Sequence, residues 1–304
     1  MYKNAVVFPG QGSQSVGMLS DVINEFPIAK KTIEQADAIL GFSLSEMILN
    51  GPIESLNSTS NTQPALVAVE VALWRALNGK VAAEVMAGHS LGEYSALVCA
   101  GAISYETALK LVRRRGELMQ IAVPNGVGAM AAILGMDDTL VENICAEQAM
   151  GQVAQAVNYN SPGQLVIAGN KEAVERAVVA CKEGGAKRAL MLQVSGPFHS
   201  ALMAPAAVDF ETYLKQFEII TPAIPVLQNA GNEFVTNVDQ IRSNLIKQIA
   251  SPVRWTQTVQ LLADNGVQNL VEVGPGKVLT GLNKRIAKNL NNVSVNSVAS
   301  ILGL

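Results

Sequence analysis

The chain has 304 residues, of which 49% are hydrophobic and only 15% are charged, and its formal net charge is −3. This length suits one large domain, or a large domain that carries a smaller inserted one, with an ample hydrophobic core. The slightly acidic balance, without a basic stripe, argues against nucleic acid as the main ligand. The three cysteines show no C-x-x-C spacing, so neither a disulfide framework nor a zinc or other metal site is expected.

The sequence also lacks the signals of membrane insertion and secretion. No run approaches the ~18 apolar residues that a spanning helix needs, since even the stretch 64–77 is interrupted by Glu70 and Arg75. The N-terminus leads directly into an apolar segment at 5–8, without a signal-peptide pattern. We therefore expect a cytoplasmic protein that does not bind a membrane.

The first part of the chain alternates expected strands with expected helices. An apolar strand at 5–8 leads into a glycine-rich loop at 9–14, and a second short strand is expected at 85–87. Helices are expected at 28–40, 53–56, 63–77, 93–98 and 104–122. Such alternation is typical of a mostly parallel sheet covered by helices. The glycines of the loop do not match the G-x-G-x-x-G pattern of dinucleotide binding, because the glycine after Gly12 is Gly17.

The second expected strand ends in Gly88-His89-Ser90-Leu91-Gly92, directly before a helix. A G-x-S-x-G sequence at a strand-to-helix turn is a nucleophile elbow. Its glycines let two backbones approach closely and tolerate the strained backbone that pushes the serine Oγ clear of the sheet. The helix behind the elbow points its N–H groups at any oxyanion formed there. Ser90 is therefore the candidate nucleophile, and the large domain is expected to be α/β-hydrolase-like.

The middle of the chain follows a different order. Strands are expected at 128–134, 153–158, 164–168 and 188–194, with helices at 138–150 and 171–183. This β-α-β-β-α-β order is that of the ferredoxin-like arrangement. The sequence thus predicts an α/β fold with a discontinuous large domain (1–125 and 197–304) and an inserted ferredoxin-like subdomain (126–196). A ligand pocket is expected in the cleft between them.

A serine nucleophile needs a base, and the chain has only two histidines. His89 adjoins Ser90 on a sharp turn, so its ring should point away from the Ser90 Oγ. His199, which follows Gly196-Pro197-Phe198 in a loop, is left as the candidate general base. Taken alone, His199 fits a surface histidine in a turn equally well; the elbow favours the catalytic interpretation.

Arg115 lies in the middle of the apolar stripe of the helix expected at 104–122. Arg113 and Arg114 lie about 200° and about 100° away around that helix and can be solvated. Two interpretations of Arg115 stay open. It can form a structural ion pair with a buried Asp or Glu, or it can be a fork for a substrate carboxylate. Beside a serine nucleophile, the second indicates an acyl group that bears a free carboxylate.

Taken together, these motifs resemble the malonyl-CoA:acyl carrier protein transacylases of type II fatty-acid synthesis. The resemblance runs in order along almost the whole chain, through Phe8-Pro9-Gly10-Gln11-Gly12-Ser13-Gln14, Gly88–Gly92, Arg115-Gly116, Asn160-Ser161-Pro162-Gly163-Gln164, His199 and Glu272-Val273-Gly274-Pro275-Gly276. It implies transfer of a malonyl group from malonyl-CoA to the phosphopantetheine thiol of an acyl carrier protein, by a ping-pong mechanism through an acyl-serine. No permanently bound cofactor is implied, and the product can serve fatty-acid or polyketide synthesis.

The resemblance also implies the role of each catalytic group. Ser90 is the nucleophile and His199 the base. The backbone N–H groups of Gln11 and Leu91 form the oxyanion hole. The main-chain carbonyl of Gln248 orients the histidine in place of the usual aspartate.

Substrate binding follows from the same resemblance. Arg115 binds the malonyl carboxylate, and Gln11 belongs to the substrate-binding residues. Leu91 and Phe198 are the bulky residues of malonyl-specific relatives. A phenyl ring at Phe198 would crowd an α-methyl group, so we expect malonyl-CoA to be preferred over methylmalonyl-CoA.

Carrier proteins are typically acidic, so basic residues near the cleft are candidates for docking one. These are Lys187, Arg188, Lys284 and Arg285. A solvated charged face explains the same residues equally well.

Two other functions compete with this interpretation. An esterase or thioesterase of the α/β-hydrolase type shares the elbow, but it does not account for Arg115 on an apolar face, the inserted unit or the position of Gln248. A carrier-binding module without activity would keep the fold but form no acyl-enzyme.

Overall fold

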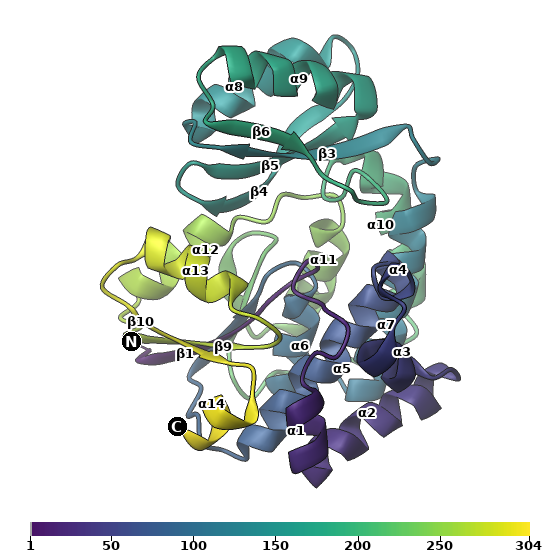
Figure 1. The fold of residues 1–304 in the computed structure, drawn as a ribbon, viewed down its shortest axis with the longest axis vertical. Coiled ribbons are helices and arrows are strands. Elements are labelled where there is room, and N and C mark those ends of the chain that lie inside the picture. The colour runs from purple at the N-terminus through teal and green to yellow at the C-terminus, as the bar shows by residue number, and fades with distance from the viewer. Residues whose placement is uncertain (1) are drawn as a thin grey trace.

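The computed structural model describes residues 2–304 and arranges them as two sheets, each with its own helices (Figure 1). The larger sheet has six strands in the order β10-β9-β1-β2-β7-β8. Its strands are β1 (Asn4–Phe8), β2 (Val85–Gly88), β7 (Val226–Gln228), β8 (Glu233–Val235), β9 (Asn269–Val273) and β10 (Asn291–Val295). All neighbouring pairs are parallel except β7 and β8, which form an antiparallel edge. The predicted α/β class with a mostly parallel sheet is confirmed.

Helices cover both faces of this sheet. They are α1 (Ser20–Glu25), α2 (Pro27–Leu40), α3 (Leu44–Asn50), α4 (Ile53–Leu56), α5 (Thr59–Leu77), α6 (Gly92–Cys99), α7 (Tyr105–Ile121), α10 (Ala204–Leu214), α11 (Val238–Gln248), α12 (Trp255–Asp264), α13 (Val278–Ile286) and α14 (Val298–Leu302), with a short 3₁₀ turn η1 (Ala201–Met203). Along β1, Val6 and Phe8 pack with α5, α6 and α7, whereas Ala5 and Val7 pack with α12 and α13. Because successive side chains of a strand point to opposite faces, a continuous apolar run is needed for a sheet buried on both sides. Within residues 2–304, no helix has the length and apolar character that crossing a membrane requires.

The smaller sheet is formed by the middle of the chain and lies above the first in the view of Figure 1. Its elements are β3 (Gly128–Leu134), α8 (Asp138–Ala149), β4 (Ala154–Ser161), β5 (Gln164–Asn170), α9 (Lys171–Glu183) and β6 (Arg188–Met191). The strand order is β4-β5-β3-β6, with antiparallel pairs throughout. This confirms the predicted β-α-β-β-α-β order; the boundaries 126 and 196 stay a prediction.

The last strand of the small sheet is shorter than expected. It was predicted to reach residue 194, but β6 ends at Met191. The N–H of Leu192 still bonds the Met130 carbonyl, and the N–H of Val194 then turns back to the Leu192 carbonyl. The chain therefore leaves the sheet at this point and forms a loop toward the large sheet.

The edge strand β4 is tied to the larger part of the molecule. The N–H of Tyr159 donates to the Val253 carbonyl at 2.9 Å, and the N–H of Val253 donates to the Val157 carbonyl at 2.8 Å. The Thr256 hydroxyl donates to the Tyr159 carbonyl at 3.0 Å. These bonds fix the small sheet over the segment before α12, with the end of β4 at the cleft.

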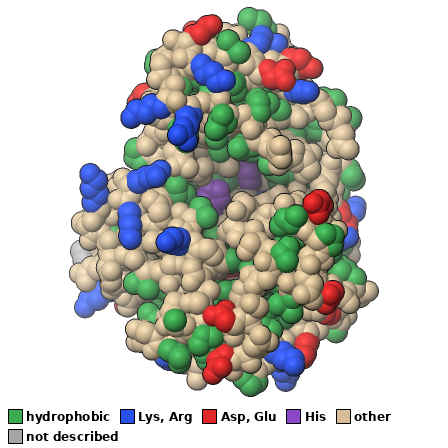
Figure 2. Space-filling model, in the orientation of Figure 1, with side chains coloured by type: hydrophobic (Ala, Val, Ile, Leu, Met, Phe, Trp, Pro, Cys, Tyr) green, Lys and Arg blue, Asp and Glu red, His purple; other side chains and the backbone are tan. Residues whose placement is uncertain are grey.

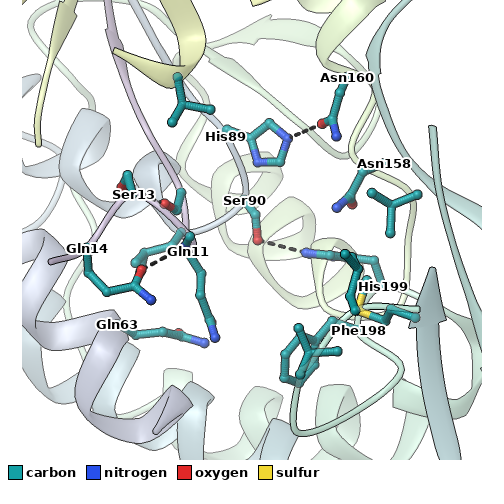
Figure 3. Close-up of a pocket in the computed structure, with 18 of the residues that line it drawn as sticks. Gln11, Ser13, Gln14, Gln63, His89, Ser90, Asn158, Asn160, Phe198 and His199 are labelled. Carbon is teal, nitrogen blue, oxygen red and sulfur yellow. Dashed lines mark hydrogen bonds between the residues drawn. The ribbon is translucent and has the colours of Figure 1, made fainter. Parts of the chain in front are cut away.

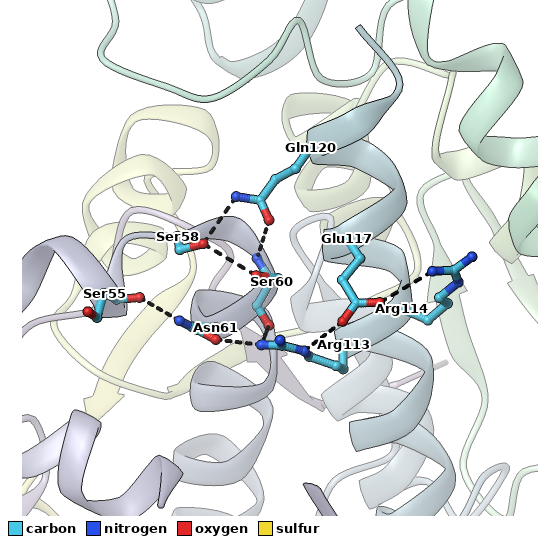
Figure 4. A network of polar contacts seen from close by, with 8 residues as sticks. All are labelled: Ser55, Ser58, Ser60, Asn61, Arg113, Arg114, Glu117 and Gln120. Atoms are coloured by element: carbon cyan, nitrogen blue, oxygen red, sulfur yellow. Dashed lines mark hydrogen bonds and ion pairs between the residues drawn. The ribbon is translucent and has the colours of Figure 1, made fainter. Parts of the chain in front are cut away.

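Helices α5 and α7 pack closely at a point where α5 has a proline and α7 has an arginine and a glycine. Pro64 lies inside α5 and has no N–H, so the Ser60 carbonyl one turn earlier lacks its helical donor. The Arg113 Nη1 on α7 donates to that carbonyl at 3.1 Å (Figure 4). A Cβ at Gly116 would lie 2.7 Å from the Ser60 Cα, so glycine is required where the helices touch.

The expectation that Arg113 and Arg114 can both be solvated is therefore only half right. The Arg113 side chain is bound to α5 by Ser60 and Asn61 and pairs with Glu117 on its own helix. Arg114, with 42% of its side chain exposed, is solvated as expected.

Candidate active site

Ser90 lies at the turn between β2 and α6, with the left-handed φ of 50°. The glycines beside it permit close approach: a Cβ at Gly88 would lie 1.9 Å from the Gly92 carbonyl carbon, and one at Gly92 would lie 2.1 Å from the Phe8 carbonyl oxygen. Neither of these two glycines has a positive φ. The strain expected of the glycines is thus carried by the serine itself, and the glycines serve packing alone.

His199 meets Ser90 from the loop before η1. Its Nε2 lies 2.8 Å from the Ser90 Oγ (Figure 3). Its Nδ1 lies 2.9 Å from the Gln248 carbonyl oxygen. Because a carbonyl only accepts, Nδ1 carries the proton and the bare Nε2 faces the serine hydroxyl. His199 is only 5% exposed, so the interpretation as a surface histidine is wrong.

The charge state of His199 follows from its surroundings. Burial, with the positive charge of Arg115 as the second cause, lowers the pKa of His199 to about 3. The imidazole is therefore neutral near pH 7 and can accept a proton.

His89 points away from the nucleophile, as predicted. Its Nε2 lies 2.9 Å from the Asn160 Oδ1 at the end of β4, and its ring centroid lies 5.7 Å from that of Trp255. Burial lowers the pKa of His89, so the neutral ring donates to Asn160. This bond joins the elbow to the small sheet.

The Arg115 guanidinium is 1% exposed and is directed at the nucleophile. Its Nη1 donates to the Gln63 Oε1 at 2.9 Å, and its Nη2 donates to the Gln248 Oε1 at 2.8 Å and the Ser90 Oγ at 3.1 Å. Among residues 2–304, no carboxylate lies within ion-pairing distance of it. The interpretation as a structural ion pair is therefore wrong, and the guanidinium is free to pair with an incoming anion.

A cavity of about 490 Å³ opens beside these groups. Strands of the small sheet, loops and helices of the larger part and the loop after β6 line it. The lining residues include Gln11, Ser90, Leu91, Arg115, Met130, Asn158, Asn160, Val166, Phe198 and His199. In Figure 2 histidine side chains are visible at the bottom of the hollow between the two parts. The N–H groups of Gln11 and Leu91 have no acceptor among the described residues. Six of the seven predicted site residues line this cavity, and the seventh, Gln248, binds His199 from behind.

Two of the residues that hydrogen-bond to Ser90 or Arg115, Gln63 and Asn229, were not predicted. Gln63 binds Arg115, and Asn229 accepts from the Ser90 N–H at 2.7 Å and donates to the Gly88 carbonyl at 2.7 Å. A signal was present for both, since each is a polar residue next to an apolar run. Asn229 follows β7, and side chains at the carboxyl ends of parallel strands meet at one edge of the sheet.

Comparison with known proteins gives close relatives over the whole length. The family described as "Acyl transferase domain" matches residues 5–303. The malonyl CoA-acyl carrier protein transacylase of Haemophilus influenzae is 55% identical over 303 residues, which are 99% of this chain and 97% of that protein. The enzyme of the same name from Escherichia coli K12 is 52% identical, over 99% of this chain and 98% of that protein.

Solved structures give the same result. An acyl carrier protein S-malonyltransferase from Vibrio cholerae shares 53% identity and a TM-score of 0.97, over 99% of both chains. A malonyl-transacylase solved in complex with a type II PKS acyl-carrier protein shares 51% identity and a TM-score of 0.97, over 99% of this chain and 98% of that one. The resemblance inferred from the motifs is confirmed. This chain belongs to the malonyl CoA-acyl carrier protein transacylase family of acyltransferases.

Proposed function

We propose that this chain transfers the malonyl group of malonyl-CoA to the phosphopantetheine thiol of an acyl carrier protein, through a malonyl ester of Ser90. The observation that carries the proposal is the buried Arg115 guanidinium, which has no carboxylate partner and lies 3.1 Å from the Ser90 Oγ. An acyl group that ends in a carboxylate satisfies this charge. An acetyl group leaves it buried and unpaired, which is unfavourable.

In the first half-reaction, His199 Nε2 takes the Ser90 hydroxyl proton while Oγ attacks the thioester carbonyl carbon. The negative charge moves to the carbonyl oxygen, where the N–H groups of Gln11 and Leu91 stabilise it. When the carbon–sulfur bond breaks, the CoA sulfur takes the proton from His199. CoA leaves as the thiol, and malonyl-Ser90 remains.

The second half-reaction reverses these steps with a new thiol. His199 takes the proton of the phosphopantetheine thiol, whose sulfur attacks the ester carbonyl. When the carbon–oxygen bond breaks, Ser90 Oγ takes the proton back from His199. The product is the malonyl thioester of the carrier protein, and the enzyme is regenerated.

The carbonyl that holds His199 suits this chemistry. The Gln248 carbonyl fixes the imidazole tautomer but stabilises the imidazolium less than a carboxylate would. A base of reduced strength is sufficient for attack by a thiol and disfavours attack by water. It therefore favours transfer over hydrolysis.

The chain's own residues supply every group in this scheme, so malonyl-CoA and carrier-bound phosphopantetheine enter as substrates and no resident cofactor is proposed. The cytoplasmic location expected from the sequence belongs to the same proposal. The relative solved with a type II PKS carrier protein supports acyl carrier protein as the partner, for either fatty-acid or polyketide synthesis.

The intact mass of the protein after brief exposure to malonyl-CoA, with acetyl-CoA in parallel, tests the proposal. We expect one malonyl adduct that maps to Ser90, is absent in Ser90→Ala, and is far weaker with acetyl-CoA. Equal labelling by both esters would remove Arg115 as the carboxylate-binding group. Steady release of CoA without an adduct and without a thiol acceptor would identify a hydrolase instead.

A further inference from the structure

Glu93, in the first turn of α6, is a carboxylate that the reaction above does not use. It is completely buried. Its Oε2 accepts from the N–H of Asn229 at 2.7 Å, and its Oε1 accepts from the Nε2 of Gln228 at 2.9 Å. The Gln228 Oε1 in turn accepts from the Asn244 Nδ2 at 3.1 Å. Both carboxylate oxygens are thus directed at the end of β7 and the residue after it, away from the cavity.

Asn229 connects Glu93 to the nucleophile. Its Oδ1 accepts from the N–H of Ser90, and its Nδ2 donates to the carbonyl of Gly88, both at 2.7 Å. One amide therefore satisfies a donor and an acceptor on either side of His89. Asn229 is 3% exposed, so water cannot readily replace these bonds. Leucine, of similar size, offers neither group.

The elbow depends on such support because its conformation is unfavourable for a residue with a side chain. Ser90 has a φ of 50°, and left-handed backbone outside glycine persists only where the surroundings fix it. The Gln248 Nε2 holds the Ser90 carbonyl at 3.0 Å, while Asn229 holds its N–H. Rotation of either peptide plane would turn Oγ away from the His199 Nε2.

We propose that Glu93 is a positioning residue for the acyl transfer: through Asn229 it holds the main chain of Ser90 in the conformation that directs Oγ at His199. Glu93 touches neither the cavity nor the reacting atoms, and it acts as a double hydrogen-bond acceptor. The inference rests on the proposed function only in that acylation of Ser90 by malonyl-CoA is the reaction measured.

The test compares single-turnover acylation of Ser90 by malonyl-CoA in four variants. Glu93→Ala and Asn229→Leu each remove the link, and a misplacement of this kind lowers the acylation rate by about 10²-fold. The KM for malonyl-CoA changes less than the acylation rate, because Arg115 keeps its hydrogen bonds to Gln63 and Gln248 and loses only a through-space attraction to Glu93. Glu93→Gln keeps an oxygen for the Asn229 N–H, and the amides of Gln228 and Asn244 can turn over to match, so it recovers most of the rate.

Glu70→Gln is the matched control. Glu70 is also completely buried, on α5, and burial raises the pKa of Glu70 well above its usual value. The amide in Glu70→Gln therefore resembles the neutral carboxyl group that it replaces, and we expect an unchanged acylation rate.

A fluorophosphonate, which reports the reactivity of the Ser90 Oγ without any CoA ester, is applied to the same variants. The inference is overturned if folded Glu93→Ala and Asn229→Leu react at the normal rate, or if Glu93→Gln loses as much as Glu93→Ala. Asn229→Leu decides the matter where Glu93→Ala yields no folded protein. If malonyl-CoA fails to label the unmodified chain while the fluorophosphonate rates still divide the variants, the positioning role stands and the proposed function fails.

Discussion

At the site, the neutral imidazole of His199 lies near the positively charged guanidinium of Arg115. His199 lies next to Ser90, and the positive group that faces it is the Arg115 guanidinium. Burial disfavours a positive charge on His199, and the charge of Arg115 acts in the same direction. The base is thereby kept unprotonated well below the pH at which an ordinary histidine becomes charged.

This environment predicts an unusual pH dependence of acylation. Because the pKa of His199 is about 3, kcat/KM for malonyl-CoA should stay flat from about pH 7 to about pH 5, where an ordinary histidine with a pKa of about 6.5 would be largely protonated. A bound malonyl carboxylate neutralises Arg115 and so raises the pKa of His199, which places the acid limb of kcat at higher pH than that of kcat/KM. Rapid-quench acylation across this range measures both; a kcat/KM limb near pH 6.5 would contradict the assignment.

The same shift affects stability, and this provides the control. A histidine whose pKa is lower in the folded chain stabilises the fold fully above its unfolded pKa of about 6.5, and that contribution is lost as the pH falls toward about 3. The folded fraction must therefore be recorded at each pH, so that loss of rate is not confused with unfolding.

Phe198 provides a prediction about acyl selection. It is 7% exposed and lines the cavity together with Ser90 and His199. Phe198→Ala makes room for an α-methyl group, so kcat/KM for methylmalonyl-CoA relative to malonyl-CoA should rise by about tenfold. Both substrates meet the same folded fraction, so the ratio cancels any loss of stability. If the ratio of the two kcat/KM values is unchanged in Phe198→Ala, or if the two kcat/KM values are equal in the unmodified chain, Phe198 is excluded as the selecting residue.

At the level of single residues, the sequence predicts the reactive groups better than the residues that hold them in place by hydrogen bonds. Ser90 was identifiable from the elbow motif, His199 as the other of the two histidines, and Arg115 as a charged residue on an apolar helix face. Gln63 and Asn229 are uncharged amides whose roles depend on distant segments. Their hydrogen-bond partners could not be assigned without the fold.

Among the secondary-structure elements, the contact between α5 and α7 shows how a local defect is compensated. The Ser60 carbonyl loses its helical donor to Pro64 and gains the Arg113 Nη1 instead. The hydrogen-bond network of Figure 4 surrounds this point with polar side chains from both helices. The same helix carries Arg115 into the site, so one turn of α7 bears an arginine that joins the two helices and an arginine that lines the cavity.

Arg113→Ala should therefore destabilise the fold by about 1–2 kcal/mol, as expected for lost hydrogen bonds to a charged group that is one-third exposed. Arg114→Ala is the matched control, because its exposed ion pair with Glu117 contributes less than about 1 kcal/mol. Urea unfolding gives both values, and the acylation rate of folded protein should stay unchanged in both. Equal stabilities of the two variants would contradict the role of Arg113.

The sequence predicted some elements more reliably than others for a physical reason. The strands β1 and β2 and the helix α7 carry strong apolar patterns, and similar patterns at 128–194 predicted the β-α-β-β-α-β order. The strands β7 and β8 have three residues each, too few for a periodicity to emerge. They form by pairing at the sheet edge, which depends on tertiary contacts rather than on local pattern.

At the scale of the whole molecule, contacts between the two parts bring basic residues of α13 and of the small sheet to the same side of the cleft. Arg285 on α13 donates to the Gln164 Oε1 at the start of β5, at 2.8 Å. Gly163 precedes it and bonds the N–H of Gly135, against which the Lys187 side chain packs. Lysine and arginine side chains flank the hollow on one side of Figure 2. The candidate docking residues are Lys187, Arg188, Lys284 and Arg285, all exposed.

The positive charges of these residues would attract the acidic side chains of a carrier protein. The double variant Lys284→Glu, Arg285→Glu should raise the KM for the carrier protein by about tenfold at low salt and weaken its salt dependence. The KM for the isolated pantetheine thiol should not change. Lys30→Glu, Lys31→Glu on α2, also an exposed pair, is the matched control. If both double variants behave alike, the surface is only a solvated charged face.

The strand order has a consequence for how the protein is made. β1 lies inside the sheet between β2 and β9, and the hydrogen bond from Asn269 to Asn4 joins residues 265 positions apart. On the ribosome, β1 can pair with β2 early, but its second neighbour β9 emerges much later. Ser90 likewise emerges long before the side chains of Asn229 and Gln248 that hold its backbone. We therefore expect Ser90 to gain its capacity to take an acyl group only after the segments that contain Asn229 and Gln248 have been made and have folded against it.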